Sequence, residues 1–222
     1  MMNKKNKFYN KLVKKPWGNE YLIYENRKVA AWFLNIKYNK STSLHCHPLK
    51  KTGFILLKGS VAMNVGFYQK KKFKALNKIM IRPGLFHSTK AISKQGAQII
   101  EIESPNNKNN LIRFKDDYGR EKKPYENSKN IIDLPKNFLK LNNKKKFKFA
   151  SCNFEITKYK KIHKTSLLSK KKIYAIIDGG LGTNSKNLVL APGDIVRANT
   201  IQKLSQSFQP SPYIRILSIS LC

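Results

Sequence analysis

The chain is short of acidic residues and of arginine. Its 222 residues include 12 Asp and Glu against 45 Lys and Arg, which gives a formal net charge of +33 at pH 7. Such a charge suits nucleic acid or an anionic membrane, but proteins that read phosphates and bases favour Arg. Only six of the 45 basic residues are Arg, and the lysines occur in runs along the whole chain. We therefore expect solvated lysine-rich surfaces and neither a nucleic acid nor a membrane as a partner.

Cysteine is equally scarce. The three cysteines, Cys46, Cys152 and Cys222, form no C-x-x-C motif, which argues against a disulfide scaffold. The basic N-terminal stretch is not followed by an apolar core of the kind found in signal peptides. No apolar run reaches the roughly 18 residues that a membrane-spanning helix needs. These absences predict a cytoplasmic location.

The apolar residues, 41% of the chain, occur in short runs. In the first half these runs have the length of strands, are mostly bounded by Gly, Pro, Asn or Lys, and show no helical period. They lie at 21–24, 29–36, 54–57, 61–67, 78–81 and 97–103. The pattern predicts antiparallel β-structure, and closing it into a barrel or double-sheet jelly roll would remove the exposed edges and leave an interior for a ligand.

A weaker copy of this pattern follows residue 148, which predicts an all-β protein made of two tandem barrels. The matched segments are 54–64 with 174–184, 78–87 with 187–196, and 98–104 with 214–220. The expected domains are a first barrel at 1–122, a polar linker at 123–147 and a degenerate second barrel at 148–222. Val196 stands where the first copy has His87. The second barrel is therefore expected to be structural or a dimerisation element, with a ligand pocket of its own as the less favoured alternative.

Three of the four histidines fall in two short motifs. His45 and His47 form an H-x-H pair, and His87 ends the sequence RPGLFH 40 residues after His47. In a strand, alternate side chains share a face, so both imidazoles of the pair would point into the barrel while Cys46 points away. A third imidazole after a Pro-Gly turn would complete a three-nitrogen site for a divalent metal ion such as zinc, iron, manganese or nickel. The alternative is three unrelated histidines.

The H-x-H pair, Gly59 and the Pro-Gly-x-x-His turn resemble the two signature motifs of the cupin superfamily, which are small metal-binding jelly-roll (double-stranded β-helix) barrels. Over about residues 14–122 the chain is similar to the cupin domain of type II mannose-6-phosphate isomerases and related proteins of surface-polysaccharide pathways. The segments that carry this likeness are KKPWGNEYLIY, STSLHCHPLKKTGFILLKG, MIRPGLFH, IIEIESP and NNLIRFKDDYGR. The resemblance implies an isomerase activity and is consistent with a homodimer, and the second copy of the pattern would make the chain a bicupin.

The chain departs from this family at three positions. Thr52 stands where cupins usually have a glutamate ligand, Lys50 matches a family arginine, and His45 falls where the isomerases usually have glutamine. Threonine is a poor metal ligand. The expected ligand set is therefore His45, His47 and His87 with waters, which leaves positions open for substrate.

Carboxylates are expected from a later strand. In IIEIES, Glu101 and Glu103 alternate with isoleucines and share one face. If the isoleucines pack against another layer, both acids point into the cavity, and the alternative is an exposed polar edge. An inward Glu101 would be the general base of an aldose–ketose interconversion, which moves a proton between adjacent carbons. Glu103 would then contact the substrate.

Charged residues after this strand are expected at the mouth of the barrel. Asp117 and Tyr118 would contact the substrate, and Arg113, Arg120 or Lys50 would hold its phosphate, with Arg giving a bidentate grip. Lys50 and Arg120 are counted with Glu101 as catalytic. The alternative is a salt-bridged loop that only caps the barrel.

The sequence is compatible with three functions. The leading hypothesis is a metal-dependent isomerase or epimerase acting on a sugar phosphate or nucleotide sugar, which would be its small-molecule partner. A three-histidine non-haem iron dioxygenase is the rival enzyme, because histidines with open positions suit Fe(II) and oxygen. The third is a non-catalytic carbohydrate-binding bicupin, which the missing glutamate and the missing second site favour.

Overall fold

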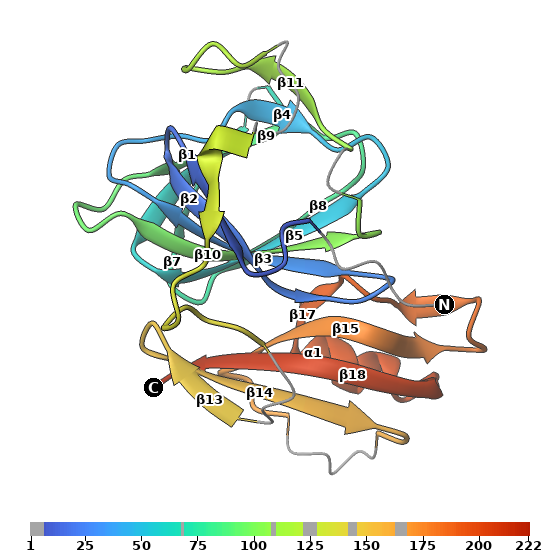
Figure 1. Ribbon diagram of the computed structural model, residues 1–222. Helices are drawn as coiled ribbons and strands as arrows, with labels where there is room; N and C mark the ends of the chain where they lie inside the picture. The colour runs from blue at the N-terminus through green and yellow to red at the C-terminus, as the bar shows by residue number, and fades with distance from the viewer. Residues whose placement is uncertain (1–6, 68, 108–109, 122–127, 142–145, 163–167) are drawn as a thin grey trace.

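The computed structural model describes residues 7–67, 69–107, 110–121, 128–141, 146–162 and 168–222. The protein is all-β, as the sequence predicts: the described residues form eighteen strands in three antiparallel sheets, one short α-helix and one 3-10 turn. Figure 1 shows the three sheets as stacked layers. The described helix is not of a length and hydropathy that could cross a membrane.

The middle layer is a seven-stranded sheet that contains most of the predicted strands. Its central strand, β3 (AAWFLNI), is buried at all but one position, so both of its faces are covered and its sequence is apolar almost throughout. The strands in spatial order are β12 (Ile131–Asp133), β1 (Lys11–Lys15), β2 (Gly18–Glu25), β3 (Ala30–Ile36), β10 (Ala97–Ser104), β5 (Lys51–Lys58) and β8 (Lys78–Ile81).

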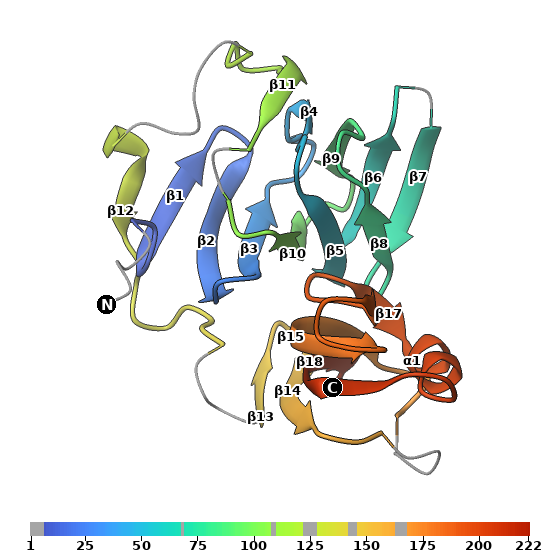
Figure 2. The same cartoon turned by 90° about the vertical axis from the view of Figure 1, so that its right-hand side faces the viewer.

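A five-stranded sheet packs on one face of the middle layer, and the two together form the first barrel, a jelly roll. Its strands in order are β11 (Ile112–Lys115), β4 (Leu44–Cys46), β9 (His87–Ala91), β6 (Ser60–Val65) and β7 (Gln69–Lys74). The barrel interior holds a core that includes Trp32, Phe54 and Met63. Figure 2 shows the two sheets side by side above the C-terminal residues.

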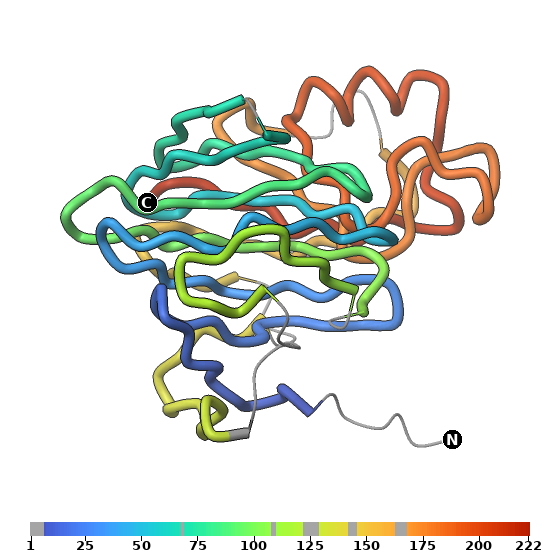
Figure 3. The backbone as a smooth tube through the Cα atoms, turned by 90° about the horizontal axis from the view of Figure 1, so that it is seen from above, coloured from blue at the N-terminus to red at the C-terminus, as the bar shows by residue number. Residues whose placement is uncertain are grey.

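The C-terminal sheet is the third layer. Its path is β13 (Lys146–Phe149), β14 (Cys152–Tyr159), β18 (Gln209–Leu221), β15 (Ile173–Gly182) and β16 (Leu188–Leu190), and β17 (Ile195–Arg197) also pairs with β15. One face packs on the outer face of the middle sheet through a shared core that contains Ile100 and Ile102 of β10. Helix α1 (Ala198–Leu204) covers the other face. In the view from above, the barrel strands lie over the C-terminal ones (Figure 3).

The internal repeat is visible in the order of the strands. The order β3-β10-β5-β8 in the middle sheet has its counterpart in β14-β18-β15-β17 of the C-terminal sheet. The pairing differs from the sequence match at 187–196, because β16 pairs with the far end of β15, and α1 follows β17. The described residues after 146 form one sheet, so the degenerate copy has a single layer there.

The stretch expected to be a polar linker contains ordered structure. A 3-10 turn (Ser128–Asn130) leads into β12, which pairs with β1 at the edge of the middle sheet. Leu139 and Leu141 are buried in the core between the middle and C-terminal sheets. The predicted boundary between residues 122 and 123 lies outside the described residues, and the one between residues 147 and 148 falls within β13.

Candidate metal centre

Strands β4 and β9 bring the three motif histidines together. His45 in β4 is paired across the sheet with His87, the first residue of β9, and His47 directly follows β4. The ring centroids are 4.4 Å apart for His45 and His87, 5.0 Å for His45 and His47, and 5.5 Å for His47 and His87. One ligand nitrogen of each ring lies within 4.8 Å of the other two. Gly84, with φ of 74°, forms the turn before β9, and its N–H donates to the His47 carbonyl at 2.9 Å, which ties the two motifs together.

A backbone carbonyl fixes the tautomer of each imidazole. The Nδ1 atoms lie 2.8 Å from the Ser43 oxygen for His45, 2.6 Å from the Asn110 oxygen for His47, and 3.0 Å from the Leu85 oxygen for His87. A carbonyl only accepts, so each Nδ1 carries the proton and each Nε2 keeps its lone pair. The Nε2 atoms of His47 and His87 are buried and have no hydrogen-bond partner among the described residues.

Burial keeps the three imidazoles neutral. It lowers the pKa of His47 to about 3 and that of His87 to about 4, and it brings the pKa of His45 well below its usual range. The Lys50 ammonium lowers the pKa of His47 further, and the Glu103 carboxylate partly opposes this. Neutral imidazole is the form that binds a metal ion.

Strand β10 contributes two carboxylates to the same interior. Ile100 and Ile102 face the C-terminal sheet, while Glu101 and Glu103 line the pocket that the histidines line. Both glutamates are buried, with 6% and 1% of their surface exposed. The alternation of β10 thus gives the inward orientation considered from the sequence, rather than an exposed edge.

Glu103 lies next to Thr52, the residue at the position where cupins usually have a glutamate ligand. Thr52 of β5 is directly opposite Glu103 in the register of β5 and β10. His47, Glu101 and Glu103 each offer a ligand atom within 4.8 Å of the other two. A carboxylate from the neighbouring strand therefore lies close to the histidines even though Thr52 itself carries none.

Lys50 is buried and bound to one of these acids. Its Nζ donates to Oε1 of Glu103 at 2.7 Å, and the same oxygen lies 4.0 Å from Nε2 of His47. The side chain expected to hold a substrate phosphate is thus part of an internal ion pair next to the histidines.

The histidines and glutamates line one pocket, called here the histidine pocket, of about 570 Å³ with its open mouth included. Three of the chain's 12 acidic residues line it. The other residues of the lining are Lys15, Trp17, Glu20, Leu34, Thr42, Ser43, Phe54, Thr89, Leu111, Arg113 and Arg120.

Lys15 and Glu20 were not expected in this site. Their Nζ and Oε1 atoms are 3.7 Å apart, and the side chains are 3% and 6% exposed. A signal was present in GNEYLIYE, because period-two alternation puts Glu20 on the face of Leu22, which belongs to the barrel core. An acid on the apolar face of a strand marks a polar site in the barrel wall.

Both predicted arginines line the histidine pocket, but one lies in a strand and the other in the loop that follows it. Arg113 lies in β11 opposite His45. Arg120 makes a bidentate contact with Asp116, from Nε at 2.9 Å and from Nη2 at 2.8 Å. Burial would raise the pKa of Asp116, but the hydrogen bonds and charge of Arg120 outweigh it and hold that pKa below its usual range.

The other two predicted residues lie outside the lining. Asp117 is exposed. The hydroxyl of Tyr118 accepts a hydrogen bond from the Ser41 backbone N–H at 3.3 Å, and the Arg120 guanidinium lies 5.4 Å from its ring centroid. This loop therefore combines a salt-bridged cap with one arginine that reaches the pocket.

The donor set of the histidine pocket fits a divalent metal ion. Two buried imidazole nitrogens have no partner within the described chain, the third lies within 4.8 Å of them, and the backbone holds every ring by its other nitrogen. Three histidines with a nearby carboxylate suit zinc, iron, manganese or nickel.

Comparison with family models and with curated proteins finds no match. Among solved structures, KdgF from Halomonas sp. is 12% identical, with a TM-score of 0.40, covering 42% of this chain and 84% of that chain. A conserved protein with a double-stranded β-helix domain from Klebsiella pneumoniae is 15% identical, with a TM-score of 0.38 and coverage of 40% and 76%. The cupin domain of Schizosaccharomyces pombe Cnp3 is 13% identical, with a TM-score of 0.38 and coverage of 40% and 64%. A similar backbone does not fix an activity, so the function rests on the residues of the site.

Proposed function

We propose that this protein is a metal-dependent isomerase or epimerase that acts on a sugar phosphate or a nucleotide sugar in surface-polysaccharide biosynthesis. The observation that carries the proposal is the arrangement of three neutral imidazoles and two buried carboxylates around one pocket. His45, His47 and His87 would hold the metal ion. Such an ion would act as a Lewis acid toward a sugar carbonyl or hydroxyl.

Glu101 is the residue proposed to move the proton. It is paired in register with Trp32 on one side and Phe54 on the other, so apolar rings flank its place in the sheet. A carboxylate held in such a setting can take a proton from one sugar carbon and return it to the next. Glu103 is held by Lys50 and would contact the substrate from the same strand.

The cations of the pocket support an anionic substrate. Lys15, Arg113 and Arg120 line its wall, and guanidinium groups bind phosphate oxygens with good geometry. The acids beside them would accept hydrogen bonds from sugar hydroxyls. This combination suits a polyhydroxylated phosphate ester better than a purely apolar substrate.

One observation favours a second candidate, the non-haem iron dioxygenase. Lys50 binds Oε1 of Glu103 at 2.7 Å, so a metal ion would have to compete with this lysine for the carboxylate. Without the carboxylate the ligands are three histidines, a set that suits Fe(II) and oxygen. Turnover that stops in oxygen-free buffer would support this candidate, whereas an isomerase is indifferent to oxygen.

The first test is the metal content of protein purified without chelators, measured by elemental mass spectrometry. We expect about one metal ion per chain, lost in His45→Ala and in His87→Ala but kept in Asn64→Ala, an exposed position on the same sheet. Aldose–ketose interconversion of sugar phosphates would then be assayed with and without oxygen. Failure to bind metal even after reconstitution would reject both enzyme proposals and leave a carbohydrate-binding protein, which sugar-binding assays would identify.

A further inference from the structure

A turn of the C-terminal sheet presses on the back of the strands that carry the site. Residues 191–194 connect β16 to β17. Oδ1 of Asp194 lies 2.5 Å from Nζ of Lys51, at the start of β5, while its Oδ2 accepts the Ala191 backbone N–H at 2.7 Å. The Asp194 carboxylate thus forms a hydrogen bond within its own turn and an ion pair with Lys51 of the barrel.

The turn and Ile195, the first residue of β17, approach the barrel closely at two glycines. A Cβ on Gly193, whose φ is +93°, would lie 2.5 Å from Cβ of Ser104 at the end of β10. A Cβ on Gly53 of β5 would lie 2.3 Å from Cδ1 of Ile195. At Gly193 the nearest atom is a Cβ, which cannot move without its backbone, whereas at Gly53 it is the flexible end of the Ile195 side chain. The turn and the residue after it therefore pack closely against the barrel.

The register places these contacts on either side of the site. Lys51 pairs with Ser104, and Gly53 pairs with Ile102, on the face that meets the C-terminal sheet. Between them, Thr52 pairs with Glu103, whose side chain faces the histidine pocket. The turn therefore supports the backbone on both sides of the residue that binds Lys50 and approaches His47.

We propose that the turn at 191–194, together with Ile195 at the start of β17, is a positioning element that sets the place of Glu103 beside His47. This gives the C-terminal sheet a role in the site although it contributes no residue to the pocket lining. The role goes beyond the proposed activity, because the placement of Glu103 matters for whatever the histidine pocket binds.

The test compares two glycines of the C-terminal part, Gly193 in the turn and Gly180 in β15, at each of which an added Cβ would clash. Gly193→Ala would push on Ser104. Gly180→Ala would instead push on the Leu190 carbonyl, 2.3 Å from its Cβ, within the C-terminal sheet itself. Asp194→Asn removes the charge opposite Lys51 and keeps an oxygen for the turn, so it serves if Gly193→Ala does not fold.

The first readout needs no metal. The ¹H–¹⁵N spectrum of the imidazoles is simple in a chain with four histidines, and the His47 signals report the carboxylate 4.0 Å away. We expect the chemical shifts of the His47 imidazole to change in Gly193→Ala and Asp194→Asn, and to be unchanged in Gly180→Ala. Adding Ser104→Gly to Gly193→Ala removes the Cβ of residue 104 that the new methyl group would meet. The His47 signals should then return toward their wild-type chemical shifts, although the strain of a left-handed alanine remains.

The second readout is Co²⁺ binding followed by visible absorption. Misplaced groups around metal ligands typically cost on the order of 10-fold in affinity, and we expect that loss in Gly193→Ala but not in Gly180→Ala. The proposal is overturned if the His47 signals of Gly193→Ala and Asp194→Asn match the wild type, or if Gly180→Ala moves them as much. A wild-type protein that binds no Co²⁺ would count against the proposed function, while the metal-free spectra would still decide the positioning role.

Discussion

Lys50 and Glu103 form an ion pair with 2.7 Å between Nζ and Oε1, and their side chains are 0% and 1% exposed. Both charged groups are buried. Replacing either one alone destabilises the folded state, because the remaining charge is then buried without its counter-charge.

We therefore predict that Lys50→Met and Glu103→Gln each lower the free energy of unfolding by about 3–5 kcal/mol. The double variant Lys50→Met/Glu103→Leu, which leaves neither charge, should recover most of the loss. Urea unfolding of the metal-free proteins measures all three. Single variants within about 1 kcal/mol of the wild type would show that solvent reaches the pair.

The buried histidines predict how stability depends on pH. The pKa of His47 is lowered from 6.5 to about 3 and that of His87 to about 4, so below pH 6.5 the unfolded chain takes up protons that the folded protein does not. The free energy of unfolding should thus be lost as the pH falls from 6.5 toward 4, by up to about 1.4 kcal/mol per pH unit for each histidine. Urea unfolding at several pH values, with a chelator present, measures the slope. It should flatten in His47→Gln/His87→Gln, and an unchanged slope would contradict this assignment.

If Glu101 moves the proton, Glu101→Gln should reduce kcat by about 10²- to 10⁴-fold. Metal content should change little, because the amide keeps the size of the side chain and the three histidines remain. Asp133→Asn, an exposed acid in β12, is the control for loss of one negative charge and should keep full activity. Full activity in Glu101→Gln would assign the proton transfer to another group.

The bidentate contact between Arg120 and Asp116 makes the lysine substitution informative. Arg120→Lys keeps the positive charge but cannot reproduce the two parallel hydrogen bonds at 2.9 and 2.8 Å, so it should destabilise the protein by about 1.5–3 kcal/mol. Thermal or urea unfolding would show this, with Lys115→Arg in the exposed part of β11 as the control. An unchanged unfolding midpoint would mean that the loop contributes nothing to stability.

Much of the barrel was predictable because its strands obey simple periods. The apolar runs became β2, β3, β5, β6, β8 and β10, and the H-x-H pattern correctly placed His45 and His47 on one face of the chain. The alternation in IIEIES predicted that the glutamates and isoleucines would face different layers. Each of these inferences depends only on side chains that are near in sequence.

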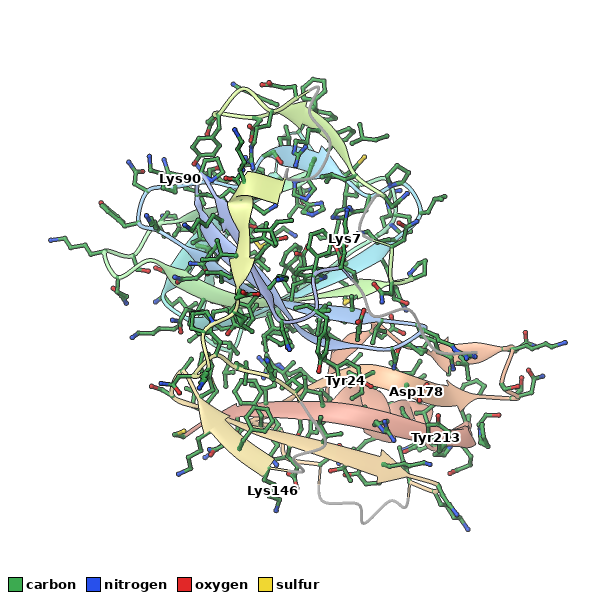
Figure 4. All side chains as sticks on the ribbon, viewed as in Figure 1. Lys7, Tyr24, Lys90, Lys146, Asp178 and Tyr213 are labelled. Atoms are coloured by element: carbon green, nitrogen blue, oxygen red, sulfur yellow. The ribbon has the colours of Figure 1, made fainter. Side chains whose placement is uncertain are left out.

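Contacts between distant segments could not be predicted in this way. The partner of Lys50 is 53 residues away in sequence, and nothing local distinguishes this lysine from the other basic residues. The seating of Gly193 on Ser104 joins segments from the two copies of the repeat. A further long-range pairing involves residues labelled in Figure 4: Tyr24 of the barrel interacts electrostatically with Tyr213 of the C-terminal sheet, whose hydroxyl donates to Asp178. Such pairings depend on how sheets stack, which no period in the sequence records.

Strand β10 belongs to two interiors at once, with isoleucines in the core shared with the C-terminal sheet and glutamates in the histidine pocket. Inserting or deleting a single residue before Glu101 would exchange these faces, sending carboxylates into a dry core and isoleucines toward the histidines. This segment should therefore tolerate conservative replacements far better than any change in its length. Natural variation among homologues should accordingly place insertions in the turns on either side of this strand.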